Sequence, residues 1–357
     1  MNSSDLVRAR LHNQRLSSPD VKKPVDVLHW FGAMQAQDFS GAKWALARRM
    51  SDGTNTLIEK AFNEGKILRT HVMRPTWHFV APDDIRWLLR LTAARVNVAT
   101  GSNYRKLELD ERTFTRCNKA IITALKNQEH LTRARLKTVI NEAGVTADDP
   151  IRLAHILLRA ELDGVICSGP RLNNQFTYTL LDKRVRNATV LDRDESLAKL
   201  TRRYFTSHGP ATLRDFAWWS GLTVADAKLG LALAERHLTK ISIDNELYWT
   251  SKEVVPVQLP LRSACLLPAY DEYLVAYKDR KALFSDTGAQ NVIFGATLVL
   301  EGKIAGTWKV SNQKTTLTLT LKPLEPLKRT EQLVISKEID RYAHFLETRI
   351  SPEFEQP

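Results

Sequence analysis

Cysteine is scarce in this sequence. Its 357 residues include three cysteines, Cys117, Cys167 and Cys265, and these lie far apart along the chain. Such a set is too small and too scattered for a disulfide framework or a four-ligand zinc site. The composition therefore excludes a small disulfide-stapled scaffold and favours a reducing compartment.

Long apolar runs are also missing from the sequence. No stretch approaches the ~20 consecutive apolar residues that a membrane-spanning helix needs. The first residues, Met1–Asp5, lack the basic and apolar regions of a signal peptide, and the charged Arg8 and Arg10 lie just after them. We therefore expect a cytoplasmic protein without a membrane partner, associated with the nucleoid if its source is prokaryotic.

Acidic residues are outnumbered by basic ones. Lys and Arg total 52 against 40 for Asp and Glu, so the net charge is +12 and the pI is about 9.6. An excess of this sign suits a polyanion such as nucleic acid, because neutralised phosphates release counterions. The alternative is that the basic excess only keeps the protein soluble and that the protein has no anionic partner. The 43% of hydrophobic residues excludes a disordered chain, and the length allows two to four modules.

Two glutamines, Gln35 and Gln37, bracket a single small residue at a junction between predicted helices. Pro24 opens the first predicted helix, over 25–33, and a second helix is predicted over 42–50. Residues two apart point roughly 200° apart on a helix but share one face in an extended segment. Joint action by the glutamines therefore requires non-helical backbone. The alternative is that these polar residues only cap a helix or form the turn between the two helices, with Asp38 as a candidate N-cap.

A basic hairpin is predicted over residues 66–80. Trp77 and Phe79 alternate with polar neighbours, which is the period-two pattern of a half-buried strand. A bend is predicted at Arg74-Pro75, because proline presets a turn conformation. The hairpin would present a set of basic side chains: Arg69, His71, Arg74 and His78.

The order of helices followed by a strand pair occurs three times, over about 5–100, 112–186 and 194–250. In the second segment, three helices precede a hairpin whose turn contains Arg171, which is the pattern of a winged helix. Its third helix carries Arg152 and Arg159 on one side, and such modules usually place this helix in a DNA groove. A winged helix that serves only as an interaction or dimerisation scaffold is the alternative.

Strand-like runs dominate after Pro256, at 264–267, 292–300, 303–310 and 315–321, before a final helix. They predict a small β-barrel or curled sheet with an insertion at 267–280. The fold class is thus predicted as α+β, with three tandem winged-helix motifs and a small C-terminal β-barrel. The predicted domains are 1–110, with the glutamines and the basic hairpin, 111–190, 191–255 and 256–357.

Four segments, in order, resemble a known family. They are Leu28–Asp38, Arg69–His78, Leu266–Tyr273 and Gly302–Trp308. Together they are similar to the winged-helix DNA glycosylases typified by AlkZ and its relative YcaQ. The resemblance implies three tandem winged helices and a β-barrel. It also implies a monofunctional enzyme that hydrolyses the N-glycosidic bond of alkylated purines, including bulky and cross-linked adducts.

The resemblance also implies the site. Gln35-Ala36-Gln37 matches the family's catalytic signature, although Ala36 is a small choice for its hydrophobic position. The residues expected to bind DNA are Arg69, His71, Arg74, Thr76, His78, Arg152, Arg159 and Arg171. Those expected to support the site are Asp38, Tyr270, Asp271 and Trp308. The expected partner is double-stranded DNA carrying alkylated bases, bound by a monomer that uses no cofactor and no metal.

Two other functions compete with this interpretation. A tandem winged-helix protein could bind DNA or regulate without any chemistry. A metal-dependent nuclease is disfavoured, because the sequence shows no carboxylate and histidine cluster with ligand spacing.

Overall fold

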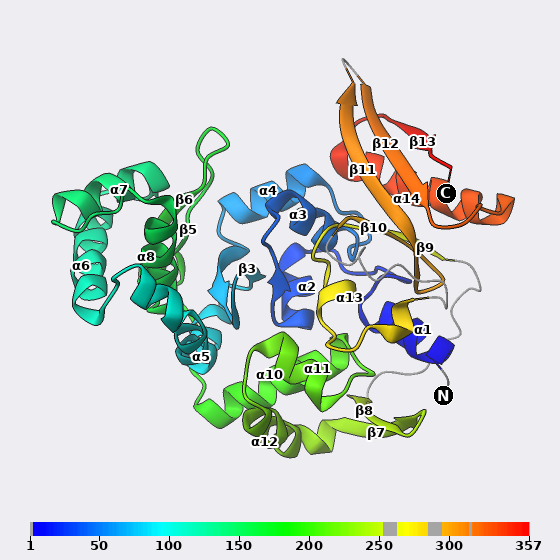
Figure 1. Ribbon diagram of the computed structural model, residues 1–357, viewed down its shortest axis with the longest axis horizontal. Helices are drawn as coiled ribbons and strands as arrows, with labels where there is room; N and C mark the ends of the chain where they lie inside the picture. Colours follow the sequence, from blue (N-terminus) through cyan, green and yellow to red (C-terminus); the bar gives the residue numbers. More distant parts are fainter. Residues whose placement is uncertain (1–2, 253–262, 285–294, 314–315, 357) are drawn as a thin grey trace. The chain divides into compact units, whose positions relative to one another are not determined.

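The computed structural model describes residues 3–252, 263–284, 295–313 and 316–356, which form helices and strands in a mixed α/β fold (Figure 1). The chain divides into two units. Unit 1 comprises Met1–Glu59, Ala198–Trp219 and Val224–Pro357, and unit 2 comprises Lys60–Leu197 and Ser220–Thr223. The first of these divisions falls inside the predicted module 1–110.

The N-terminal segment forms four helices, and the two predicted over 25–33 and 42–50 lie within three residues of their expected limits. The four are α1 (Ser3–Asn13), α2 (Pro24–Phe31), α3 (Phe39–Ala47) and α4 (Asn55–Asn63). Pro24 occupies the first turn of α2, where its missing N–H costs nothing. Gly32, at φ +89°, ends the helix, and its N–H donates to the Leu28 carbonyl at 2.7 Å. This turn directs the chain into the short strand β1 (Met34–Gln35).

Unit 2 contains the second predicted winged-helix segment. Its elements are β2 (Leu68–Val72), β3 (Arg74–Val80), α5 (Ile85–Lys106), α6 (Glu111–Asn127), β4 (Leu131–Thr132), α7 (Arg133–Glu142), α8 (Pro150–Leu162), β5 (Ile166–Ser168), β6 (Thr177–Leu180) and α9 (Leu181–Arg184). Side-chain oxygens of Asp110, Thr132 and Asp149 cap α6, α7 and α8 by accepting from backbone N–H groups. Strands β4, β6 and β5 form one antiparallel sheet in that order.

The predicted bend of the basic hairpin at Arg74-Pro75 is wrong. Both residues belong to β3, and the chain turns at Met73, which has φ +63°. The Met73 N–H donates to Thr92 Oγ1 at 3.1 Å, which fixes this conformation from outside the hairpin. The strand register shifts next to Val72, so Pro75 lies at an irregularity of the ladder, where a residue without an N–H is tolerated.

The third predicted segment forms α10 (Arg193–Ser207), α11 (Leu213–Ser220), α12 (Val224–Ala234), the 3₁₀ turn η1 (Glu235–His237), β7 (Leu238–Ile243) and β8 (Glu246–Ser251). Asp244 and Asn245 join the two strands at φ +48° and +64°. Positive φ at both positions is the geometry of a type I′ hairpin turn. The predicted hairpin at Asp244-Asn245 is confirmed.

The C-terminal segment forms an open sheet. Its strands are β9 (Ala264–Leu267), β10 (Thr297–Leu300), β11 (Lys303–Gln313), β12 (Thr316–Pro323) and β13 (Ile350–Phe354), ordered β13-β12-β11-β10-β9, with β13 parallel to β12. Helix α14 (Arg329–Leu346) contacts both edge strands, β9 and β13 (Figure 1). Residues 292–294 and 315 of the predicted strands lie outside the described ranges.

A closed barrel, which was predicted for this segment, is not found among these strands. Closure would require β9 and β13 to pair with each other. A covering helix is another way to protect a sheet edge, and α14 contacts both.

The apolar core of unit 1 joins the two ends of the chain. Val7, Leu11 and Leu16 pack with side chains of β9, β10, β11, α13 (Glu272–Val275) and the 3₁₀ turn η2 (Lys281–Leu283). The predicted insertion at 267–280 therefore runs through the core, and all four residues of α13 are buried. Within the described ranges, no helix is long and apolar enough to cross a membrane.

Candidate active site

The backbone between Gln35 and Asp38 is not helical. Met34 and Ala36 are 2% and 0% exposed, whereas Gln35 is partly exposed and Gln37 is exposed. Gln35 is the last residue of the short strand β1, and Gln37 lies in the bend that leads to α3. The backbone between the two accessible glutamines is thus non-helical, and the small Ala36 is buried between them.

Asp38 closes this loop as the N-cap of α3. Its side chain accepts a hydrogen bond from the Ser40 N–H at 3.2 Å. The turn is tight, because a Cβ added at Gly41 would lie 2.5 Å from Asp38 Oδ2 and 3.0 Å from Pro268 Cβ. The structure thus brings the first and third family-like segments together.

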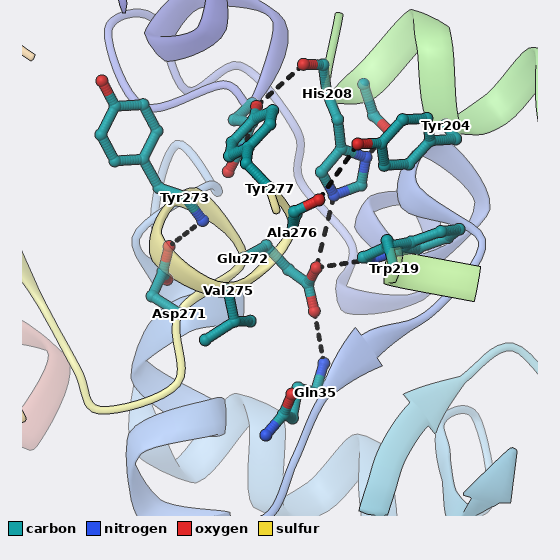
Figure 2. Close-up of polar contacts among 12 residues, drawn as sticks. Gln35, Tyr204, His208, Trp219, Asp271, Glu272, Tyr273, Val275, Ala276 and Tyr277 are labelled. Carbon is teal, nitrogen blue, oxygen red and sulfur yellow. Dashed lines mark hydrogen bonds and ion pairs between the residues drawn. The ribbon is translucent and has the colours of Figure 1, made fainter. Parts of the chain in front are cut away.

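The backbone of Gln35 is held by a buried carboxylate that the sequence analysis missed. The Gln35 N–H donates to Glu272 Oε1 at 2.6 Å, and Trp219 Nε1 donates to Oε2 at 2.8 Å (Figure 2). Glu272 is 1% exposed. One signal was available in the sequence, since Glu272 follows Asp271 inside an otherwise apolar, family-like segment.

His208 is the third group beside this carboxylate. It is fully buried, with Nε2 3.4 Å from Glu272 Oε2 and Nδ1 2.8 Å from Ser207 Oγ. Burial lowers the pKa of His208, and the neighbouring Glu272 only partly offsets this effect. The Ser207 hydroxyl donates its proton to the Arg203 carbonyl at 2.7 Å, so its oxygen accepts from the His208 Nδ1–H.

Asp271, predicted as a supporting residue, forms a buried ion pair with Arg49. Two guanidinium nitrogens donate to the two carboxylate oxygens, each at 2.8 Å, and both side chains are 0% exposed. Asp271 also caps α13 by accepting from the Tyr273 N–H at 2.9 Å. Tyr270, also predicted as support, precedes this cap at φ +62°, an uncommon conformation for a bulky residue.

Trp308 fixes the strand that leads into this segment. Its indole N–H donates to the Leu267 carbonyl at 2.9 Å, and that of Trp44 donates to the Leu266 carbonyl at 2.6 Å. Both indoles pack edge-on against Tyr342, at 4.9 Å for Trp44 and 5.0 Å for Trp308. The fourth family-like segment therefore supports the third.

Three of the predicted DNA-binding residues are buried in unit 2. The Arg69 guanidinium lies over Trp77 at 4.3 Å and over Phe176 at 4.8 Å, and the residue is 8% exposed. His71 is paired with the buried Glu161. His78 is 0% exposed, and its Nδ1 bonds the Thr76 carbonyl at 2.9 Å. Their side chains pack inside the unit.

Arg159 and Arg152 on α8 are engaged within the protein. Arg159 donates to both carboxylate oxygens of Glu111 at 2.8 Å and to Asp163 at 2.7 Å. These carboxylates raise the pKa of Arg159 against the opposing effect of burial. Arg152 donates to the carbonyls of Thr146 and Leu107.

Arg74, Thr76 and Arg171 are the more accessible members of the predicted set, since all three are partly exposed. The Thr76 hydroxyl has no hydrogen-bond partner among the described residues. The Arg171 guanidinium donates to the Asn174 carbonyl at 2.6 Å, within the turn of the β5–β6 hairpin.

Comparison with known proteins identifies the family. The structure of the Streptomyces sahachiroi DNA glycosylase AlkZ superposes with a TM-score of 0.84 at 19% identity, covering 99% of this chain and 100% of that one. A curated relative from the same organism, the interstrand DNA cross-link repair glycosylase, is 22% identical over 358 residues, which is 94% of this chain and 93% of the relative.

The family model described as "DNA glycosylase AlkZ-like" matches residues 28–345. The class is therefore that of the DNA-repair glycosylases, hydrolases that act on N-glycosyl bonds. Within this class, the chain belongs to the AlkZ-like family, as its four family-like segments predicted.

Proposed function

We propose that this protein hydrolyses the N-glycosidic bond of N7- or N3-alkylated purines in double-stranded DNA, including bulky and cross-linked adducts. One observation carries the proposal: Gln35 and Gln37 are both accessible, and the backbone between them is not helical. The curated relative is named for interstrand cross-link repair, and this supports the inclusion of cross-linked purines.

The chemistry needs little from the protein. A purine alkylated at N7 or N3 carries a positive charge and leaves readily, so no strong general acid is required. What remains is to place a water molecule and to stabilise an oxocarbenium-like sugar, and preorganised dipoles can do both.

The glutamines supply such dipoles. A glutamine carbonyl oxygen accepts a hydrogen bond from water, and its NH₂ group donates to a sugar, base or phosphate oxygen. In this proposal Gln37, the more exposed of the two, orients the nucleophilic water, and Gln35 supports the water or the sugar. Asp38 acts as a helix cap and takes no part in the reaction.

Binding to DNA is proposed for the predicted set, with Arg74 and Arg171 making the first contacts because they are partly exposed, whereas the Thr76 hydroxyl is buried. Contacts by Arg69, His71 and His78 would require these side chains to leave their present packing. We also propose that the modules are tandem winged helices. The order of α6, α7 and α8 followed by the β5–β6 hairpin supports this for 111–190.

The test is base release from alkylated duplex DNA. Wild-type protein should create abasic sites that alkali converts to strand breaks, with no breaks before alkali if the enzyme is monofunctional. Gln35→Ala and Gln37→Ala should lose release of 7-methylguanine and keep duplex affinity. Gln332→Ala, an exposed glutamine on α14, is the matched control.

Unchanged release in both active-site variants would overturn the catalytic assignment. Wild-type protein that binds duplex DNA but releases no base from any alkylated substrate would instead be a DNA-binding protein without chemistry.

A further inference from the structure

We infer that Glu272 is a positioning residue that sets the catalytic loop, an inference that rests on the proposed function. At 1% exposure its carboxylate cannot contact DNA directly, so it acts through another residue. The contact in question is the 2.6 Å hydrogen bond from the Gln35 backbone N–H to Oε1 (Figure 2). It fixes the peptide from which the Gln35 side chain projects.

The adjacent residue holds the other end of the same segment. The loop continues into α3, and Arg49 just beyond this helix is paired with Asp271 at 2.8 Å. Two consecutive carboxylates, at the N-cap and first position of α13, therefore bind both ends of the chain segment 35–49. Because α13 is buried, these two contacts fix the position of the loop relative to the core of unit 1.

The chemistry of the site requires a carboxylate at position 272. Two N–H donors converge on it, and each uses a different oxygen: Gln35 N on Oε1 and Trp219 Nε1 on Oε2. A glutamine offers one acceptor oxygen and places an NH₂ group against the second donor. An aspartate is shorter by one methylene and would not reach both donors.

The first experiment compares Glu272→Gln with Glu338→Gln. Glu338 is also a buried carboxylate of unit 1, and it accepts from Arg48 at 2.6 Å, at the opposite end of the segment 35–49 from Gln35. Single-turnover base release should fall about 10- to 100-fold in Glu272→Gln, the loss typical of a small misplacement of catalytic groups. Release by Glu338→Gln should remain near the wild-type rate, and both variants should keep the wild-type duplex Kd.

Amide hydrogen exchange gives a readout that does not depend on activity. The Gln35 amide should lose protection in Glu272→Gln and keep it in Glu338→Gln, because only the first substitution changes its acceptor. This measurement tests the contact even if the proposed reaction is wrong.

A double-substitution cycle separates positioning from a general loss of packing. In a Trp219→Phe background the second donor is absent, so the amide oxygen introduced by Glu272→Gln can accept from Gln35 while its NH₂ group faces His208 Nε2. In this background, Glu272→Gln should reduce base release by less than about threefold relative to Trp219→Phe alone. Such a difference from its effect in the wild-type background would show that the two sites are strongly coupled.

Three results would overturn the inference: unchanged Gln35 protection in Glu272→Gln, lost protection with unchanged release, or an equal loss of release in both backgrounds. A wild-type protein that releases no base overturns the proposed function instead. In that case only the exchange result bears on how the loop is held.

Discussion

Replacing Asp271 by asparagine measures how strongly its buried ion pair with Arg49 stabilises unit 1. Both partners are 0% exposed, and two hydrogen bonds of 2.8 Å join them. Asparagine keeps one oxygen but presents an NH₂ group to the guanidinium, so it leaves a buried positive charge without its counter-charge.

Removing one partner of a buried pair typically costs about 3–5 kcal/mol. We expect the lower end, about 3 kcal/mol, because Arg49 also donates to the Ala45 carbonyl and to Gln14 Oε1 at 2.9 Å. For a chain of this size, such a loss corresponds to a Tm lower by on the order of 4 °C. Asparagine is also a good N-cap, so the α13 cap should survive.

Thermal and urea unfolding, followed by circular dichroism, measure this loss. Asp52→Asn is the control, since Asp52 and its partner His344 are exposed, and it should leave the midpoint unchanged. The double variant Arg49→Met/Asp271→Asn should be more stable than Asp271→Asn alone, because no buried charge remains unpaired. The reasoning would be refuted if the double variant lost as much stability as Arg49→Met and Asp271→Asn lose in sum. It would also be refuted if the midpoint of Asp271→Asn equalled that of the control.

Three further predictions concern other groups. Because burial lowers the pKa of His208 below its ordinary 6.5, the neutral imidazole contributes stability that is present above about pH 6.5 and lost as the pH falls through the lowered pKa. The stability lost between pH 7.5 and pH 5.5, measured by denaturation, should be smaller in His208→Gln than in the wild type. An equal loss of stability would contradict a lowered pKa for His208. Burial raises the pKa of Cys117 and Cys265 to about 11 and that of Cys167 to about 12, so a thiol reagent at pH 8 should label native protein only at the rate of unfolding. Rapid labelling of any thiol in the native protein would contradict its burial. Finally, Asp38→Asn should retain base release and stability, whereas Asp38→Ala should lose about 1 kcal/mol of stability. A collapse of activity in Asp38→Asn would show that the charge at this position takes part in the reaction.

Local features were predicted well because local physics decides them. Pro24 and Asp38 mark the first turns of two helices, and Asp244-Asn245 makes the hairpin turn, since caps and turns depend on neighbours in the sequence. The requirement for extended backbone between Gln35 and Gln37 also followed from the geometry of the chain alone. The four family-like segments predicted the family.

Strand alternation identifies the two faces of a strand but not what covers them. Strand β2 is buried on both faces, so Arg69 and His71 pack inside unit 2 although the pattern suggested a basic surface. Whether the C-terminal sheet closes depends on which elements meet its edges, and α14 contacts them both.

The contacts that anchor the segment carrying Gln35 and Gln37 were decided only by the tertiary structure. Glu272 lies 237 positions from Gln35, and Asp271 lies 222 positions from Arg49. No local propensity links residues so far apart, and only the packing of both ends of the chain into one core places them in contact. The sequence by itself singled out Gln35 and Gln37 as candidates for the chemistry, and the fold determined which buried charges anchor the segment that carries them.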